Sequence, residues 1–263
     1  MLLVVLLAGS LEAAGPTSSA QAATTVKVRL RTAVHRLPVA AETRSGYRRT
    51  TFRLWVDADH DCRDTRDEVL AAESRTRVSG CDVRRGRWMS YYDRRTFTRS
   101  SGLDIDHLVP LAEAWDSGAR KWSAGTRQRY ANDLGDSRTL VAVSASTNRS
   151  KGDRDVAQWL PRHGRCRYVS QWTAVKTRWG LTVDRAEKRR LTRLAAGCAN
   201  VVLTLHRAKV VRGGSTPPTH SGDDPRFDTC ADAKAAGYGP YYRGRDPEYR
   251  WYRDGDSDGV VCE

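Results

Sequence analysis

Asp-Ile-Asp-His-Leu-Val-Pro occupies positions 104–110 of the chain, and Thr-Asn-Arg-Ser-Lys-Gly occupies positions 147–152. The first stretch places an Asp-His doublet at the end of an apolar run, and the second places Asn-Arg at the start of a helix. A histidine exchanges a proton near neutral pH, and a divalent metal ion neutralises charge that develops on a phosphate. The pairing therefore predicts that two strands and a helix assemble a one-metal phosphodiesterase site.

The periodicity of apolar residues around these stretches predicts a mixture of helices and strands. Strands are expected over residues 47–56, 88–92 and 140–143, and residues 24–37 are expected to form a strand or an extended arm. Helices are expected over residues 108–115, 127–130, 168–179 and 184–199, and two more should begin near Thr65 and Asn148. Apolar residues recur at three-to-four spacing within 168–179, so its tryptophans are interpreted as core residues and not as platforms for stacked bases.

The chain has 263 residues and a formal net charge of +14, with arginine as the main cation. Such a charge attracts polyanions, either nucleic acid or the anionic polymers of a cell wall. An arginine-rich composition also follows from GC-rich coding, so charge alone is weak support for a nucleic-acid partner. After the N-terminus, no segment of the sequence is apolar enough to predict a membrane span.

The N-terminus has the features of an export signal. Residues 2–7 form a short apolar run, and Ala-Gln-Ala at positions 20–22 fits the small-x-small cleavage pattern. No Lys or Arg precedes the run, which departs from the usual basic start, and a buried N-terminal strand is the alternative interpretation. We expect a signal peptide over residues 1–22 and a secreted, monomeric protein.

Six cysteines fit an extracellular location, because disulfides persist in oxidising compartments. They fall into three pairs that are consecutive along the chain, and each pair encloses one local unit. Each bond would stabilise the fold by roughly 3 kcal/mol in the loop-entropy account. A zinc site would need Cys-x-x-Cys spacing, which the sequence lacks. The expected disulfides are Cys62–Cys81, Cys166–Cys198 and Cys230–Cys262.

In their order and spacing, the two stretches resemble the HNH (ββα-metal) endonucleases, and specifically their secreted actinobacterial branch. The resemblance covers about residues 50–200. It implies an α+β fold in which a ββα-metal core carries flanking helices, over an expected nuclease domain at 23–210. It also implies hydrolysis of phosphodiester bonds in DNA or RNA. Oxygen ligands suit Mg²⁺ or Mn²⁺ as the catalytic ion, whereas zinc would recruit more His or Cys.

By this resemblance, His107 is the general base that takes a proton from the attacking water. Asp106 and Asn148 are implied as the metal ligands. Arg149 and Lys151 are expected to contact phosphates, although each could equally lie on a solvated helix face. The alternative for His107 is a structural histidine held by a neighbouring aspartate.

One position departs from the family pattern. The middle Asn of the family name orients the histidine, and counting back from Asn148 places Thr139 there. A threonine hydroxyl or a backbone carbonyl could fix the imidazole tautomer, and Asn132 is an alternative. The departure leaves open which group orients His107.

The C-terminal part of the chain is expected to be a separate calcium-binding unit. A linker over residues 211–225 precedes about forty residues that cannot bury a useful core unaided. Their last ten residues, Asp-Gly-Asp-Ser-Asp-Gly-Val-Val-Cys-Glu, match the first half of an EF-hand loop. They resemble the Excalibur calcium-binding domain, expected here over 226–263, which implies as Ca²⁺ ligands Asp254, Asp256, Asp258 and Glu263.

A second acidic loop lies at residues 57–68. Its acids fall at EF-hand positions, but Cys62 stands where a glycine is needed. Thr65 and Glu68 also form a capping-box pattern, which explains Glu68 without a metal. Calcium binding and a plain turn that caps a helix therefore both remain open for this loop.

These features predict a secreted, metal-dependent and largely sequence-nonspecific endonuclease with a calcium-binding tail. The sequence shows no zinc finger or helix-turn-helix, so direct base readout is not expected. The rival hypothesis is a non-catalytic calcium-binding module that attaches to cell-wall or matrix polymers. A third is part of a polymorphic toxin, which would require an immunity partner.

Overall fold

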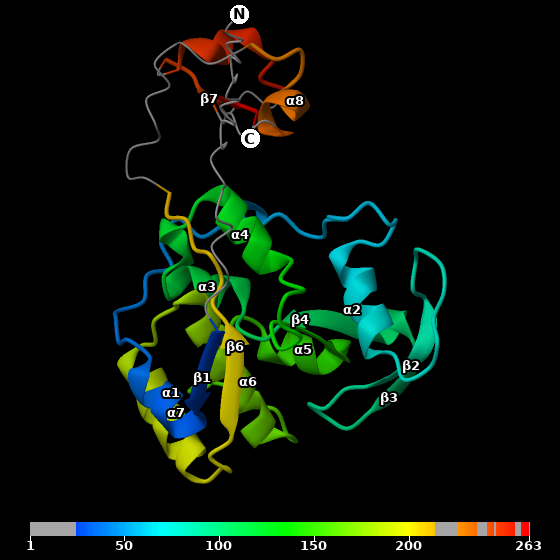
Figure 1. Cartoon of the computed structure of the whole chain (residues 1–263), viewed down its shortest axis with the longest axis vertical. Coiled ribbons are helices and arrows are strands. Elements are labelled where there is room, and N and C mark those ends of the chain that lie inside the picture. The colour runs from blue at the N-terminus through cyan, green and yellow to red at the C-terminus, as the bar shows by residue number, and fades with distance from the viewer. Residues whose placement is uncertain (1–24, 214–225, 236–240, 245, 256–258, 263) are drawn as a thin grey trace, which may run out of the picture.

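The computed structural model describes residues 25–213, 226–235, 241–244, 246–255 and 259–262 (Figure 1). The expected signal peptide and most of the expected linker lie outside the described residues. In chain order the elements are β1 (Thr25–Arg29), α1 (Leu30–Arg36), η1 (Arg49–Thr51), α2 (Thr65–Glu73), β2 (Arg85–Met89), β3 (Thr96–Arg99), η2 (Ser100–Gly102), β4 (Leu103–His107), α3 (Leu111–Asp116), η3 (Ala119–Lys121), α4 (Ala124–Ala131), β5 (Leu140–Ser144), α5 (Ala145–Lys151), α6 (Arg165–Trp179), α7 (Arg185–Ala196), β6 (Val202–His206), α8 (Cys230–Ala235), β7 (Tyr241–Tyr242), η4 (Pro247–Trp251) and β8 (Val260–Val261).

Short antiparallel strand pairs are distributed among the helices. Within the described residues, β1 pairs with β6, β2 with β3, β4 with β5 and β7 with β8. Figure 1 shows β1 and β6 beside α1, α6 and α7, and it shows β2 and β3 with α2 on the other side of β4 and α5. The expected α+β class is confirmed.

The pair β4–β5 lies at the centre of the larger unit. Asp106 is opposite Val141 and His107 is opposite Leu140 in the antiparallel register. Every residue of β5 is buried, and α5 follows β5 without an intervening loop. The end of β5 is opposite Leu103, so α5 starts beside the beginning of β4. The helix begins three residues before the expected start at Asn148.

Two apolar clusters hold β4–β5 between the helices. On one face, Ile105 and Leu140 pack with Leu70 of α2 and with Trp88 of β2. The other cluster is larger, and it gathers Trp172 of α6 with residues of α1, α7, β5 and β6. The helices expected at 168–179 and 184–199 are confirmed as α6 and α7, and the tryptophans of α6, Trp172 and Trp179, are core residues as expected.

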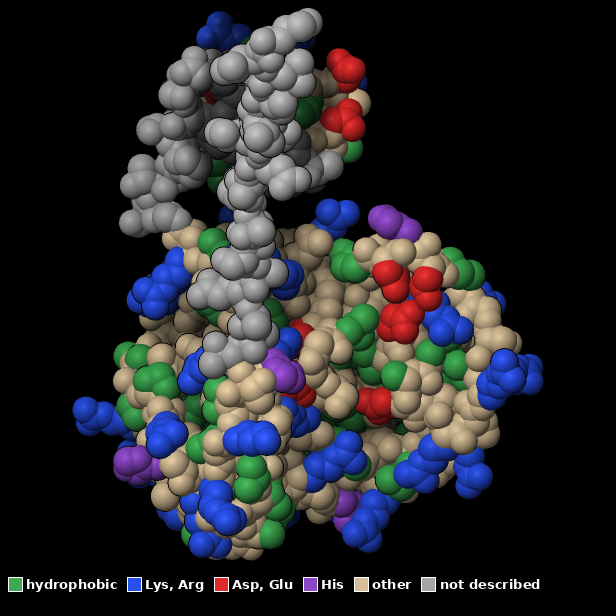
Figure 2. All heavy atoms as spheres, viewed as in Figure 1, with side chains coloured by type: hydrophobic (Ala, Val, Ile, Leu, Met, Phe, Trp, Pro, Cys, Tyr) green, Lys and Arg blue, Asp and Glu red, His purple; other side chains and the backbone are tan. Residues whose placement is uncertain are grey.

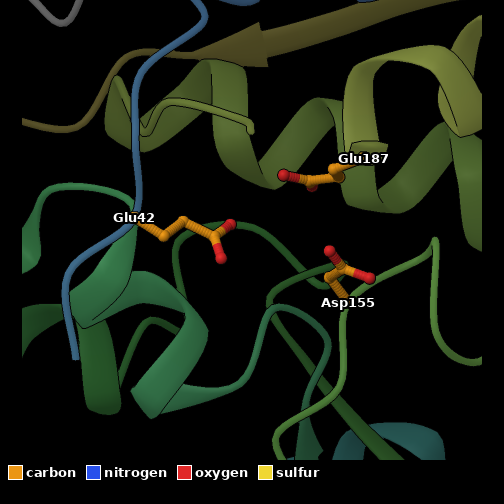
Figure 3. A group of neighbouring side chains, drawn as sticks. All are labelled: Glu42, Asp155 and Glu187. Atoms are coloured by element: carbon orange, nitrogen blue, oxygen red, sulfur yellow. The ribbon is translucent and has the colours of Figure 1, made fainter. Parts of the chain in front are cut away.

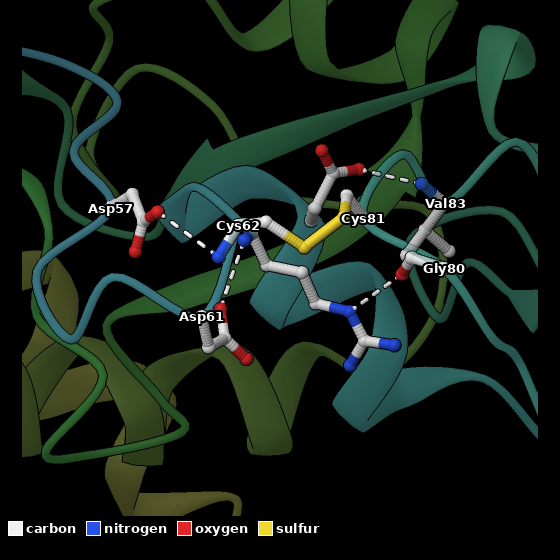
Figure 4. Close-up of a disulfide and its surroundings, with 8 residues drawn as sticks. Asp57, Asp61, Cys62, Gly80, Cys81 and Val83 are labelled. Carbon is white, nitrogen blue, oxygen red and sulfur yellow. Dashed lines mark hydrogen bonds between the residues drawn. A yellow bond between two sulfur atoms is a disulfide. The ribbon is translucent and has the colours of Figure 1, made fainter.

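The three expected disulfides are confirmed as Cys62–Cys81, Cys166–Cys198 and Cys230–Cys262. Figure 4 shows the first of these bonds with its hydrogen-bonded surroundings. It joins the acidic loop at 57–62 to the segment that enters β2. The second bond joins the start of α6 to the residues just after α7.

The expectation for residues 24–37 is confirmed only in part, and the strand expected at 47–56 is wrong. Only the first part of 24–37 is a strand, because Leu30, Ala33 and Val34 are buried at helical spacing and form α1 instead. Residues 47–56 contain η1 and otherwise extended chain with no partner strand among the described residues. The amide side chain of Asn132 bonds this segment at the carbonyl of Arg53 and the N–H of Val56, which takes the place of strand pairing.

The C-terminal unit has its own small core. Ala233, Tyr241, Val261 and Cys262 are buried together, and β7 pairs with β8. The disulfide Cys230–Cys262 closes this unit. A core of this size needs such a cross-link, because so few residues bury little apolar surface.

No described helix combines the length and the apolar composition that a bilayer crossing requires.

Candidate active site

The alternation of β4 separates its side chains onto two faces. Leu103 and Ile105 point into the cluster with α2, whereas Asp104 and Asp106 point toward α5 and bond its side chains. Successive residues of a strand face opposite ways, so this split follows directly from the sequence of β4. Both aspartates are therefore neighbours of α5, but their environments differ.

Asp106 lies in a buried ion pair. Its side chain is 6% exposed, and both carboxylate oxygens accept from the Lys151 ammonium at 2.7 Å. The hydroxyl of Tyr92 donates to Oδ2 as well. Burial raises the pKa of Asp106 and lowers that of Lys151, and the opposite charges partly offset both shifts.

The buried position corrects the expectation for Lys151. Its side chain is fully buried, and the ammonium donates to Asp106 and to the carbonyls of His107 and Leu108. An ammonium has three donor hydrogens, and these acceptors use them. A phosphate contact by Lys151 is therefore wrong for this structure. Lys151 instead connects α5 to the end of β4.

The carboxylate that lies beside Asn148 is that of Asp104. Asn148 Nδ2 donates to Asp104 Oδ2 at 3.3 Å, and Arg149 Nε lies 3.6 Å from the same oxygen. Asp104 is 28% exposed and Arg149 is 76% exposed, so this group is open to solvent. A carboxylate and an amide oxygen side by side fit the preference of Mg²⁺ and Mn²⁺ for oxygen ligands. The sequence had instead predicted Asp106 as the metal ligand that accompanies Asn148.

His107 is 6% exposed and sits at the C-terminal end of β4. Its Nε2 is 2.9 Å from the carbonyl oxygen of Ala131, and its ring stacks on Trp55 with centroids 5.4 Å apart. The pKa of His107 is lowered to about 3, mainly by burial and to a smaller extent by the positive charge of Arg49, whereas the bond to Ala131 acts in the opposite direction. The imidazole is therefore neutral at physiological pH. A carbonyl can only accept, so the proton is on Nε2 and Nδ1 keeps its lone pair.

Neither side chain considered for orienting His107 has that role. The hydroxyl of Thr139 is buried and donates to Asp133 at 2.9 Å, while its carbonyl accepts from the N–H of Leu108. Asn132 bonds the segment that carries Trp55. The group that holds the imidazole is a backbone carbonyl, as one of the sequence alternatives allowed, but it belongs to Ala131.

Sequence reasoning missed three contributors to this site. Trp55 covers the imidazole, Tyr92 bonds the buried Asp106, and Arg49 places a positive charge near His107. None of them lies in either motif. Tyr92 is the last residue of the strand predicted at 88–92, but its contact with Asp106 depends on how β2 and β3 fold back against β4.

A second group of carboxylates lies elsewhere in the larger unit. Figure 3 shows Glu42, Asp155 and Glu187 pointing toward a common space, and one oxygen of each lies within 4.8 Å of the others. Lys176 is buried beside them and bonds Glu113 at 2.5 Å and Glu187 at 2.9 Å. We call these five residues the acidic cluster. Because Lys176 is held inside it, we interpret the acidic cluster as part of the core.

The acidic loop at 57–62 brings Asp57, Asp59 and Asp61 together, with one oxygen of each within 4.8 Å of the others. Cys62 has a φ of 81°, the left-handed conformation for which a glycine was expected. Its N–H donates to Asp57 at 3.1 Å (Figure 4). The loop therefore has the turn of its sequence pattern, and Glu68, in the first turn of α2, lies close to Asp61 of the loop. Whether this loop binds calcium stays a prediction.

In the C-terminal unit, only Asp254 among the four expected calcium ligands lies within the described residues. Its Oδ2 accepts from the N–H of Gly259 at 3.0 Å and from Arg243 at 2.8 Å. Asp256, Asp258 and Glu263 lie outside the described residues.

Residues 60–194 match the family described as GmrSD restriction endonucleases, C-terminal domain. The match includes β4, β5 and α5, and therefore all the residues from His107 to Asn148. The chain belongs to this family. Residues 227–263 match the Excalibur calcium-binding domain. Matches to these two domain families thus occur in one chain.

The chain is also similar to an uncharacterized secreted protein of Arthroderma benhamiae. The two are 40% identical over 157 residues, which is 58% of this chain and 76% of the relative. The relative is secreted, and the disulfides of this chain are of the kind that persists outside the cell, so the protein is extracellular. No solved structure matches the chain.

Proposed function

We propose that the protein is a secreted, metal-dependent endonuclease of the HNH (ββα-metal) type that cleaves DNA without strong sequence preference. The observation that carries this proposal is the β4–β5–α5 unit. It places a neutral histidine at a strand end and a carboxylate–amide pair between β4 and α5. Membership of a restriction-endonuclease family and a net charge of +14 support it.

His107 is the proposed general base. Its Nδ1 takes a proton from the attacking water while the Ala131 carbonyl holds the Nε2–H and fixes the tautomer. The stacked ring of Trp55 limits rotation of the imidazole. A base that is neutral before the reaction needs no prior deprotonation, so it is ready throughout the neutral pH range.

Asp104 and Asn148 are the proposed ligands of one Mg²⁺ or Mn²⁺ ion. When bound, the ion would polarise the scissile phosphate and stabilise charge on the leaving oxygen. Asp106 lies on the same face of β4, and with Lys151 it fixes α5 against the strand and so sets the position of Asn148. Arg149 is exposed beside Asp104, where it would bind a phosphate oxygen of the substrate.

The C-terminal unit is proposed to bind Ca²⁺ through Asp254, Asp256, Asp258 and Glu263. The Excalibur match over residues 227–263 supports this assignment. Calcium would stabilise a unit whose own core is small, and it would not take part in cleavage.

Nicking of supercoiled plasmid by the purified protein tests the proposal. Mg²⁺ or Mn²⁺ should support cleavage, and a chelator should stop it. Asp104→Asn should raise the Mn²⁺ concentration needed for half-maximal nicking, because a carboxylate binds a cation more strongly than an amide does. Asp228→Asn, an exposed acid of the C-terminal unit, serves as the control.

The same assay distinguishes the two aspartates of β4. If a folded Asp106→Asn variant shows the change in metal requirement and Asp104→Asn does not, then Asp106 is the ligand and our assignment is wrong. If the wild-type protein leaves DNA and RNA intact with every divalent ion, the nuclease proposal itself fails.

A further inference from the structure

Arginines are concentrated between α2 and the start of η2. Residues 75–99 contain two acids, Asp82 and Asp93, and eight exposed arginines: Arg75, Arg77, Arg84, Arg85, Arg87, Arg94, Arg95 and Arg99. Asp82 is bonded by Arg84, and Asp93 accepts from the hydroxyl of Thr147. Figure 2 shows Lys and Arg side chains over the part of the molecule where Figure 1 draws β2 and β3. The hairpin therefore carries a large excess of positive charge.

A cavity of about 440 Å³ lies within this hairpin and is lined by Thr76, Arg77, Arg85, Gly86, Thr98 and Arg99. Three guanidinium groups and two hydroxyls can donate hydrogen bonds into it, and no carboxylate is part of the lining. We call it the arginine pocket. Its chemistry suits a phosphate, because guanidinium groups bind phosphate oxygens through paired hydrogen bonds.

The strand register brings two of these arginines face to face. Arg85 on β2 is opposite Arg99 on β3, and like charges in such a cross-strand pair are destabilising. In the described part of the chain, no ion pair or side-chain hydrogen bond involves the guanidinium groups of Arg77, Arg85 or Arg99. The fold therefore keeps three unneutralised cations together, an arrangement that an anion would relieve.

The backbone holds the pocket open. The β2–β3 register shifts between Arg85 and Trp88, and Gly86 lies within this irregularity. A Cβ at Gly86 would come within 2.5 Å of the Trp88 ring, which is itself buried in the core. Only glycine fits there, and Trp88 Nε1 is bonded to the carbonyl of Leu70. The position of Arg85 is thus fixed by the core beneath it.

The arginine pocket is connected to the candidate active site by a short piece of chain. Arg99 ends β3, η2 follows, and Asp104 is the second residue of β4. Five residues span at most roughly 17 Å, which is on the order of five nucleotides along one strand of DNA. At its other end the hairpin is joined to α5, because Asp93 accepts from Thr147 at 2.9 Å.

We propose that the arginine pocket binds a backbone phosphate of the DNA substrate, within about five nucleotides of the phosphate that is cleaved. The inference rests on the proposed nuclease function and assigns it a substrate-binding site outside the catalytic residues. A phosphate contact carries no base information, so the pocket sets the position of the duplex without adding sequence preference. The disulfide Cys62–Cys81 and the bond from Arg63 to the Gly80 carbonyl hold the chain that leads into this hairpin (Figure 4).

The test uses the full-length protein and a fluorescently labelled DNA duplex in chelator, so that binding is measured without cleavage. Arg85→Gln/Arg99→Gln should weaken binding by roughly three- to thirty-fold, as expected for two partly exposed ionic contacts. The slope of log affinity against log salt should decrease by about 1.8, which corresponds to two lost phosphate contacts. Arg189→Gln/Arg193→Gln on the exposed face of α7 removes the same charge and should change binding much less.

Each outcome has a distinct meaning. If the pocket variant binds DNA like the control variant while the wild type still nicks plasmid with Mg²⁺, the pocket proposal is wrong and the nuclease proposal stands. If the wild type neither binds nor cleaves DNA, both proposals are wrong. A parallel titration with teichoic acid completes the test. If the pocket variant loses binding to teichoic acid but still binds DNA like the wild type, the pocket belongs to a cell-wall polymer and our proposal is wrong.

Discussion

Adjacent residues of β4 have different environments and therefore different roles. Asp106 faces α5 and is neutralised by Lys151, whereas His107 faces Trp55 and is bonded to a backbone carbonyl. A buried charge is tolerated only when it is paired, and a buried imidazole stays neutral. The Asp-His doublet thus combines one residue that joins α5 to β4 with one residue that we propose as the general base.

Removal of Lys151 should test the buried ion pair. Lys151→Met leaves the Asp106 carboxylate buried without a positive partner, so we expect a loss of about 3–5 kcal/mol in the free energy of unfolding. Urea denaturation gives the measurement, and Lys209→Met at an exposed position should change stability by less than about 0.5 kcal/mol. A loss below about 1 kcal/mol for Lys151→Met would show that the pair does not hold α5.

Replacement of His107 should remove the base without removing the metal site. We expect His107→Ala to reduce plasmid nicking by roughly 10²–10⁴-fold, the usual contribution of a positioned base. Half-maximal Mn²⁺ concentration should stay close to that of the wild type, because the proposed ligands are Asp104 and Asn148. His35→Ala, at an exposed position on α1, is the control. Wild-type nicking by a folded His107→Ala variant would rule out His107 as the base.

At the scale of elements, β4 and β5 contribute to two apolar clusters, one that includes α2 and another that includes α6. The burial of β5 at every residue is typical of a strand that is covered on both faces. Apolar spacing was sufficient to predict β5, α6 and α7. It failed for residues 47–56, where apolar side chains pack inward without any strand pairing.

The acidic cluster, which packs α6 against α7 and α3, should make stability depend on pH. Burial raises the pKa of Glu42 to about 7 and that of Glu187 to about 8, from ordinary values of 4.5. At a pH between the ordinary pKa and the raised pKa, such an acid carries a proton in the folded protein but has lost it in the unfolded chain. Their contribution to stability therefore falls as the pH rises from about 4.5 to about 8. Lys176 stays charged throughout this window, because its pKa is raised by Glu113 and Glu187 despite its burial.

Glu42→Gln isolates this effect. The variant should melt at a higher temperature than the wild type at pH 8, because it removes a partly buried negative charge that lies near Glu113. The difference should shrink toward pH 5, where Glu42 is protonated in the folded wild type. Thermal melts followed by circular dichroism at both pH values give the comparison. If the melting temperatures of variant and wild type differed by the same amount at pH 5 and pH 8, the raised pKa of Glu42 would be contradicted.

At the scale of the whole molecule, a part that matches the GmrSD restriction endonuclease family and a part that matches the Excalibur domain are joined in one chain. Their described residues form separate apolar clusters, and each has its own disulfides. Separate cores imply that either part can lose its structure without the other.

Truncation after Ser221 should test this separation. The shortened protein should keep its fold and most of its plasmid-nicking activity, because the candidate site lies within β4, β5 and α5. In the full-length protein, Ca²⁺ should protect residues 226–263 from limited proteolysis, and Asp254→Ala should reduce that protection. A folded truncation that no longer cleaves DNA would place the C-terminal unit in the active site.

The sequence by itself determined the local features of this protein. Consecutive cysteines pair within local units, and apolar spacing specifies the main helices and β5. Two short motifs place a histidine at the end of β4 and an asparagine within α5. The tertiary structure decided which groups meet. It set Asp104 beside Asn148, paired Asp106 with Lys151, assigned the Ala131 carbonyl to His107 and gathered the arginine pocket. Strand alternation fixes the direction of a side chain, but what covers each face comes from elements distant in the chain.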